Sequence, residues 1–254
     1  MSARVETDRR ALRLEIILVL GVSLGMDGLF ALDDLIAKLT APPPLSAQKA
    51  VLNGSQAPGR PWIDLSLQLL DILAGIVPAF LALFLLVRSG QSLASIGLDR
   101  RRPKWDAGVG SGLALLIGAP GLGLVIAAHA LGINAQVVAE ALPSVWWRYP
   151  VLLLSALQNG ALEEIVVVGY LLTRLEQLGW RPGRALVASS TLRGSYHLYQ
   201  GFGGFAGNFV MGLIFGYFFR RTKRVMPLIV AHTLIDAVSF VGYALLQGHV
   251  SWLP

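Results

Sequence analysis

The sequence predicts an all-α polytopic membrane bundle of about seven spans with a cytoplasmic N-terminus. Composition is the first observation: of 254 residues, 54% are hydrophobic and 14% are charged, whereas a typical soluble domain has about 25% charged residues. Mean hydropathy is correspondingly high, at +0.62. Run length is the second: several windows approach the roughly 20 apolar residues that span a bilayer as a helix. These runs are continuous, which excludes the alternating strands of a membrane barrel.

The seven predicted spans are residues 13–32, 65–87, 107–131, 151–172, 185–200, 205–219 and 225–247. The first is the most interrupted, because Gly21, Gly25, Asp27 and Gly28 lie within it. Residues 41–61 are rich in Pro, Ser and Gly, which predicts an irregular loop. The stretch GFGGFAGN at 201–208 predicts a tight hairpin, since a phosphate loop would need a following lysine or a Rossmann context.

Positive charge is the third observation. If the spans alternate, 16 of the 21 Lys and Arg residues fall on one side, four on the other, and Arg193 lies inside a span. The positive-inside rule then places the N-terminus in the cytoplasm and the C-terminus outside. The net charge of +6 is explained by these span ends, so we expect an integral plasma-membrane protein whose partner is the bilayer, not nucleic acid.

Ionisable side chains interrupt three of the spans. The fourth holds Glu163 and Glu164, the fifth holds Arg193 and His197, and the seventh holds His232 and Asp236. At about 1.5 Å of rise per residue, all six lie roughly 12–20 Å from the expected cytoplasmic edge. Each such group costs a few kcal/mol or more unless it is partnered. Their shared depth therefore favours a functional site over a polar network that only locks helices together.

Other intruding residues are interpreted as structural. Asp27, Asp71 and His129 have no evident partner in the sequence. Tyr196, Tyr199, Trp146 and Trp147 fit an interfacial aromatic belt. Close helix packing is predicted at the glycine pairs Gly108/Gly112 and Gly212/Gly216.

Carboxylate and imidazole groups around a dry polar pocket suit the activation of water. A glutamate can take a proton from water when its surroundings raise its proton affinity. Glu163 and Glu164 are about 100° apart around a helix, so one can face the reaction centre while the other holds a neighbour. A histidine can orient the water or donate to a developing oxyanion. No spacing of Ser, His and Asp suggests a serine protease, and Ser195 and His197 point apart on a helix.

The motifs resemble the CAAX protease and bacteriocin-processing (CPBP, or Abi) family, relatives of the type II prenyl-protein endopeptidases. That family carries EExxxR, FxxxH and HxxxN or HxxxD on successive helices. Here EEIVVV begins at Glu163, RGSYH ends at His197, and HTLID runs from His232 to Asp236. The resemblance divides one integrated membrane domain into N-terminal helices and loops, 1–148, and a CPBP-like catalytic core, 149–254.

What the resemblance implies is an intramembrane endopeptidase in which Glu163 and His197 activate the water. His232 and Asp236 would correspond to positions that stabilise the oxyanion or orient the site, and Glu164 would be a supporting carboxylate. An ionised Asp236 cannot donate to an oxyanion, so it would have to be protonated or act by orienting His232. The substrate would be a peptide or membrane protein, prenylated or not, reaching a site that opens toward the cytoplasmic half.

Two positions depart from the family pattern. The arginine of the first motif is Val168 here, and the phenylalanine of the second motif is Arg193. We expect that Arg193 supplies the missing cation and pairs with Glu164. If it pairs with Glu163 instead, the base would be weakened and the chain would be a pseudoenzyme.

Three questions stay open at this point. Family members have been called metalloproteases, so zinc is possible on Glu163, His197 and His232, although no HExxH is present. We expect metal-free glutamate chemistry and no cofactor. The alternatives to an enzyme are an inactive membrane scaffold or immunity protein of the same family and, on weaker grounds, a proton-coupled transporter, for which no inverted repeat is seen.

Overall fold

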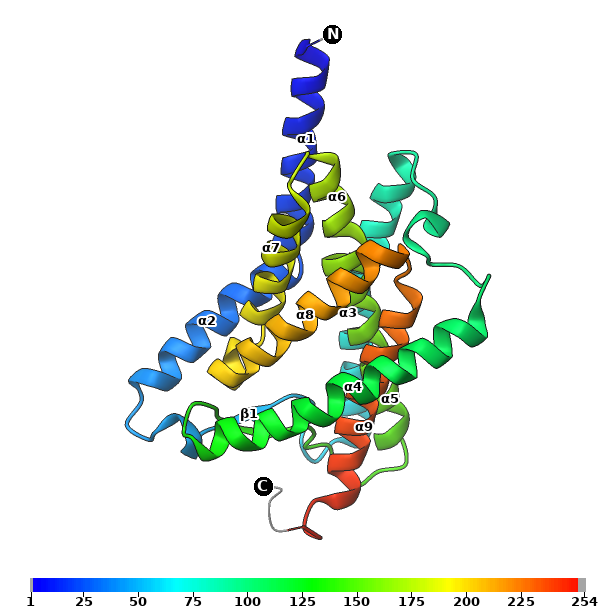
Figure 1. Ribbon diagram of the computed structural model, residues 1–254. Helices are drawn as coiled ribbons and strands as arrows, with labels where there is room; N and C mark the ends of the chain where they lie inside the picture. The colour runs from blue at the N-terminus through cyan, green and yellow to red at the C-terminus, as the bar shows by residue number, and fades with distance from the viewer. Residues whose placement is uncertain (1, 251–254) are drawn as a thin grey trace.

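The computed structural model describes residues 2–250 and confirms an all-helical architecture (Figure 1). The long helices are α1 (Ser2–Gly21), α2 (Leu24–Thr40), α3 (Pro61–Arg88), α4 (Pro103–Ala130), α5 (Arg148–Glu163), α7 (Pro182–Ser195), α8 (Phe202–Thr222) and α9 (Met226–Leu246). The π-helical turn η3 (Glu164–Tyr170) joins α5 to α6 (Leu171–Gln177) without a break. The short elements are the 3₁₀ turns η1 (Leu45–Ala47), η2 (Leu93–Ile96) and η4 (Leu198–Gln200), and the strands β1 (Lys49–Val51) and β2 (Gln136–Val138).

Proline marks where several helices begin. Pro61, Pro103, Pro182 and Pro227 occupy the first turns of α3, α4, α7 and α9. The missing N–H of proline costs nothing there, because the first N–H groups of a helix have no intrahelical acceptor. The starts of these four helices can therefore be located from the sequence.

One group of loops meets at the end of the molecule that carries the two strands; we call it the strand side. β1 pairs in parallel with β2, from Lys49 opposite Gln136 to Val51 opposite Val138. Asn134 forms an antiparallel bridge with Gly201, before α8. Loops from between α2 and α3, α4 and α5, and α7 and α8 are thereby joined, as predicted for loops on one side of a membrane.

The remaining loops meet at the opposite end, which we call the arginine side. The Arg224 guanidinium binds Asp106 at 2.7 Å and Asp99 at 3.1 Å, and Val225 N–H donates to the Ile96 carbonyl at 2.8 Å. Hydrogen bonds from Arg101 N–H and the Arg224 guanidinium lower the pKa of Asp99. We call the contacts of Arg224 with Asp99 and Asp106 the Arg224 clasp. The Asp99 part of the clasp stabilises the fold fully at pH values above the ordinary pKa of a carboxyl group. This contribution is lost as the pH falls through the lowered pKa of Asp99.

A tight approach at Gly97 gives a test of this clasp. Gly97 has φ of +65°, and a Cβ there would lie 2.3 Å from the Arg224 Cα. We expect Gly97→Ala to lower the free energy of unfolding by about 2–4 kcal/mol, because strain and overlap add. Gly90→Ala is the matched control, since Gly90 has φ of +85° but open space around it. Thermal unfolding in detergent measures both, and equal losses would contradict the role of the overlap.

Among the described residues, fewer helices could span a membrane than the seven predicted. Among the described residues, five helices or continuous helical rods are long and apolar enough to cross a membrane: 61–88, 103–130, 148–177, 202–222 and 226–246. A sixth is present if 8–21 and 24–40, bent by 51°, form one span. The fifth predicted span, 185–200, is not a full-length helix. α7 has 14 residues, which at about 1.5 Å each covers roughly 21 Å of a 30 Å hydrocarbon core.

The chain nonetheless reaches the strand side after α7. Tyr196 and His197 leave the helical backbone conformation, η4 adds a turn, and Gly201 pairs with Asn134. The predicted hairpin at 201–208 is wrong in extent, because α8 begins at Phe202 and only Gly201, with φ of +116°, makes the turn. The alternation of sides therefore survives, and which side faces the cytoplasm stays a prediction.

The two predicted parts of the chain pack as one body. α4 lies along α9, α3 lies along α5, and α2 packs on α7 and η4. Glu15 of α1 accepts hydrogen bonds from Tyr170 and from the fully buried Arg174, both at 2.9 Å. The boundary between 148 and 149 stays a prediction.

Candidate functional site

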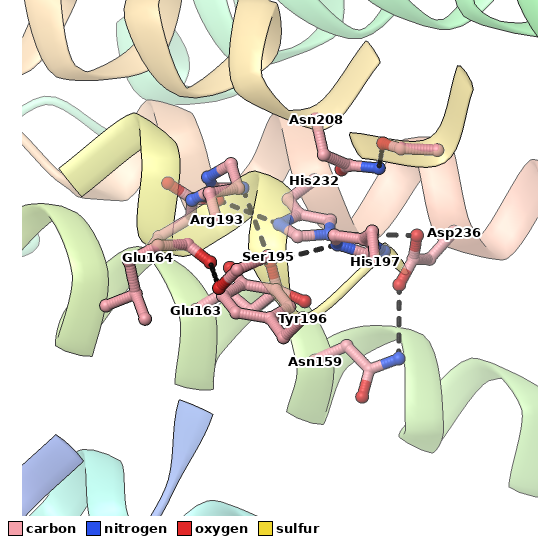
Figure 2. A network of polar contacts seen from close by, with 12 residues as sticks. Asn159, Glu163, Glu164, Arg193, Ser195, Tyr196, His197, Asn208, His232 and Asp236 are labelled. Carbon is pink, nitrogen blue, oxygen red and sulfur yellow. Dashed lines mark hydrogen bonds and ion pairs between the residues drawn. The ribbon is translucent and has the colours of Figure 1, made fainter. Parts of the chain in front are cut away.

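The six predicted ionisable residues converge between α5, η3, α7 and α9 (Figure 2). Glu163 ends α5, Glu164 begins η3, and Arg193 lies near the end of α7. His197 lies two residues after the end of α7, whereas His232 and Asp236 are one turn apart on α9. The shared depth estimated from the sequence therefore corresponds to real contacts.

Glu164, Arg193 and His232 form the sealed part of the site. Glu164 Oε1 accepts from Arg193 Nη2 at 2.7 Å and contacts His232 Nδ1 at 2.8 Å. The Glu164 and Arg193 side chains have no exposed surface, and the Arg193 guanidinium lies 5.7 Å from the centre of the Phe215 ring. A buried carboxylate is tolerated only when paired and hydrogen-bonded. Glu164 meets this requirement through Oε1, whereas its Oε2 and the Arg193 Nε are buried without a hydrogen-bond partner among the described residues.

Glu163, Tyr196 and His197 form a second, more accessible part. Tyr196 Oη donates to Glu163 Oε2 at 2.7 Å, and His197 Nε2 lies 3.9 Å from the same oxygen. Arg193 Nη1 reaches it at 3.4 Å. Gln200 Nε2 lies 3.3 Å from His197 Nδ1 and orients the ring. The side chains of Glu163 and His197 are 9% and 15% exposed, in contrast to the fully buried side chains of Glu164 and Arg193.

Asp236 continues the accessible part toward α5. Its Oδ2 accepts from Asn159 Nδ2 at 3.2 Å, and its Oδ1 lies 3.8 Å from His232 Nε2. His232 is therefore held between two carboxylates, Glu164 on one side and Asp236 on the other (Figure 2). The predicted i,i+4 relation of His232 and Asp236 is confirmed as a contact.

Two adjacent glutamates share one cation at the junction of α5 and the π-helical turn η3. Both have right-handed helical backbone angles, and both reach Arg193. A π turn changes the backbone hydrogen-bond pattern and is often found at functional sites. Ser189 Oγ on α7 donates to the Val167 carbonyl at 2.7 Å inside this turn, which ties η3 to α7.

Glycine brings the helices close enough for these contacts. A Cβ on Gly160 of α5 would lie 2.6 Å from Thr233 Oγ1 of α9. The predicted pair Gly212/Gly216 is confirmed, because added Cβ atoms would meet Ser190 and Leu186 of α7. The predicted pair Gly108/Gly112 is wrong, since both face open space. Instead Gly110 meets Pro227 and Val230 of α9, because the contact face of α4 is rotated by two residues.

Arg193 pairs with Glu164, as we expected from the sequence, and it also approaches Glu163. The distances are 2.7 Å to Glu164 and 3.4 Å to Glu163, so the stronger hydrogen bond is the predicted one. Val168 is fully buried in the apolar core within η3. Whether Arg193 replaces a cation lost at position 168 stays a hypothesis.

Two residues of the site were missed. Tyr196 was interpreted as part of an aromatic belt, which is wrong because it is buried and bound to Glu163. Its position one residue before His197 could have suggested a role. Asn159 was not singled out, although it lies one turn before Glu163 on α5 and so shares its face.

The three polar residues interpreted as structural from the sequence, Asp27, Asp71 and His129, differ from one another in their surroundings. Asp27 is exposed on α2, and its carboxylate lies near enough to Glu163 to repel it electrostatically. Asp71 is exposed on α3. His129 near the end of α4 has a buried Nδ1 without a hydrogen-bond partner among the described residues. Of the three, Asp27 is the residue that the structure connects to the site.

The donor atoms do not fit a metal ion. Among residues 2–250, no group of three or more His, Cys, Asp or Glu side chains is arranged to hold one. His232 Nδ1 is occupied by Glu164, and the Arg193 cation lies between the two glutamates where a metal would meet its charge. We therefore derive no step through zinc.

One family model matches the part of the chain that carries this site. Residues 145–238 match the family model described as type II CAAX prenyl endopeptidase Rce1-like. All six predicted site residues, and also Asn159 and Tyr196, lie inside the matched segment. Searches of curated proteins and of solved structures found no match.

Proposed function

We propose, from the match of residues 145–238 to the type II CAAX prenyl endopeptidase Rce1-like family model, that this chain is an intramembrane endopeptidase using glutamate-activated water. Its substrate is a peptide segment of a membrane-associated molecule. The observation that carries the proposal is the division of the site: the side chains of Glu163 and His197 keep some exposed surface, while those of Glu164 and Arg193 have none.

Glu163 is the general base of this mechanism. It takes a proton from water as the water oxygen bonds to the carbonyl carbon of the scissile peptide, whose oxygen becomes an oxyanion. The tetrahedral intermediate then collapses, the C–N bond breaks, and the proton passes to the leaving nitrogen. General base catalysis of this kind contributes about 10²–10⁴-fold.

His197 positions the water. Its Nε2 is buried without a hydrogen-bond partner among the described residues and lies 3.9 Å from Glu163 Oε2. A water between the two groups would satisfy both, and buried polar sites are commonly completed in this way. Tyr196 and Arg193 bind this same oxygen, Glu163 Oε2, and leave Oε1 free of both.

Glu164 supports the site by keeping Arg193 and His232 in place. It contacts both at hydrogen-bond distance and has no exposed side-chain surface, so it does not meet a substrate. A carboxylate in this position neutralises the arginine and leaves Glu163 as the group facing the accessible side.

Proteolysis by the purified full-length chain in detergent tests the function. The probes are a fluorogenic farnesylated peptide ending in a CAAX sequence and the same peptide without the lipid, each with and without a chelator. We expect cleavage that persists in chelator. Loss in chelator would replace glutamate chemistry with a metal mechanism, and cleavage of the lipid-free peptide alone would redirect the substrate class.

An inactive scaffold is the second candidate, and one observation favours it. Arg193 lies 3.4 Å from Glu163, and a buried cation at this distance stabilises the carboxylate and weakens it as a base. A folded chain that cleaves neither probe would favour this reading. Ion flux into proteoliposomes would instead favour a transporter.

A further inference from the structure

Asn159 is held in one orientation at the accessible edge of the site. Its Nδ2 donates to Asp236 Oδ2 at 3.2 Å (Figure 2). A carboxylate only accepts hydrogen bonds when ionised, so this contact fixes which end of the amide faces Asp236. The side chain is half-buried, which restricts its motion without closing it off from a substrate.

The second N–H of this amide has no acceptor among residues 2–250 in the hydrogen bonds of the structure. The two N–H bonds of a planar amide diverge by about 120°, so the second one cannot also point at the Asp236 oxygen. Asn159 and Glu163 are four residues apart on α5 and lie on one face, about 5–6 Å apart at Cβ. A substrate carbonyl bound at this face of α5 would therefore lie beside both side chains.

The sealed residues are poorly placed to meet a substrate oxygen. Arg193 has no exposed side-chain surface and is engaged by both glutamates. His232 is 5% exposed, with Nδ1 bound to Glu164 and Nε2 facing Asp236. The role of oxyanion donor, which the family resemblance implies for positions 232 and 236, therefore has a better candidate on α5.

We propose that Asn159 is a catalytic residue that donates its second N–H to the scissile carbonyl oxygen and to the oxyanion formed from it. As water oxygen bonds to the carbonyl carbon, the C=O π electrons move to this oxygen and Glu163 receives the proton of the water. The N–H stays on Asn159 throughout. Collapse of the intermediate returns the electrons to the carbonyl and releases the amine with the proton.

Asp236 has a positioning role in this arrangement. Its carboxylate orients the Asn159 amide by accepting one N–H, and it needs no proton of its own to do so. This removes the difficulty that an ionised Asp236 cannot donate to an oxyanion. The inference rests on the proposed function, because it assigns a donor to the same hydrolytic site.

Steady-state cleavage of the farnesylated CAAX peptide by full-length variants tests the assignment. We expect Asn159→Ala to lower kcat by about 10²–10³-fold, the usual loss for one oxyanion donor, with KM changed less than threefold. Gln158→Ala is the matched control, because the Gln158 amide lies against Gly75 of α3 rather than in the site. Its kinetics should equal those of the wild type.

Further variants keep the outcome decisive. Asn159→Asp preserves size and removes both donors, so it replaces Asn159→Ala if that protein fails to fold in a thermal unfolding assay. Normal kcat in either folded variant, beside a wild type that cleaves, would overturn the inference and leave the proposed function intact. A rise in KM at unchanged kcat would make Asn159 a substrate-binding group and also overturn it. A wild type that cleaves neither probe would overturn both.

Discussion

Replacing Glu163 with glutamine should remove proteolysis. The amide keeps the size and most contacts of the carboxylate but cannot take a proton from water, so we expect kcat to fall by about 10³-fold or more, at the upper part of the range for a general base. Folding should be retained, because Tyr196 Oη can still donate to the amide oxygen at the position of Glu163 Oε2. Cleavage of the fluorogenic peptide and thermal unfolding, measured on one preparation, check both statements.

Glu176→Gln is the control for this variant. Glu176 lies in α6 on the arginine side, where its exposed side chain pairs with Lys223 at 2.8 Å, so its change should leave cleavage unaffected. If Glu163→Gln retained more than a tenth of the activity, the general base would have to be another group. Asp236 would then be the next candidate, because its side chain is 18% exposed in the same accessible part.

Replacing Arg193 with methionine should destabilise the whole site. Methionine fills most of the volume but leaves Glu163 and Glu164 buried side by side without a cation. Breaking a buried ion pair by removing one partner costs about 3–5 kcal/mol, and here one guanidinium serves two carboxylates. We expect a correspondingly lower midpoint of thermal unfolding and loss of cleavage, both measured in detergent.

A double substitution separates charge from position. Val168→Arg combined with Arg193→Phe restores both residues of the family pattern, and position 168 lies one turn after Glu164 inside η3. If Arg193 replaces the missing cation, the double variant should recover part of the stability lost in Arg193→Phe. A double variant no more stable than the single one would contradict the compensation hypothesis, and so would an Arg193→Met protein with normal stability and cleavage.

The sequence predicted the site well where one-dimensional spacing carries the information. Glu163, His197 and Asp236 could be assigned a common depth by counting residues from the arginines at span ends, because helical rise is nearly constant. Sidedness was recoverable for the same reason: each loop rich in arginine joins others of its kind, as Arg224 does with Asp99.

Rotation around a helix was harder to predict than depth. The predicted contact face of α4 was off by two residues, since Gly108, Gly110 and Gly112 are indistinguishable by composition alone. Tyr196 was misassigned because its direction depends on the backbone leaving the helix just there. The π turn has no evident mark in the sequence EIVVVGY, and tertiary contacts such as that from Ser189 help to select it.

The η3 turn also sets the angular phase of the continuous rod from α5 to α6. One end of the rod presents Glu163 to the site, and the other end presents Tyr170 and Arg174 to Glu15 of α1. A regular α-helix with the same number of residues would turn these two faces by about 100° relative to each other, because a π turn accommodates about one extra residue. The π geometry is therefore what keeps the first helix and the site on the same rod in register, and forcing 165–169 into regular α-helix without shortening the chain would uncouple them even if every named side chain remained.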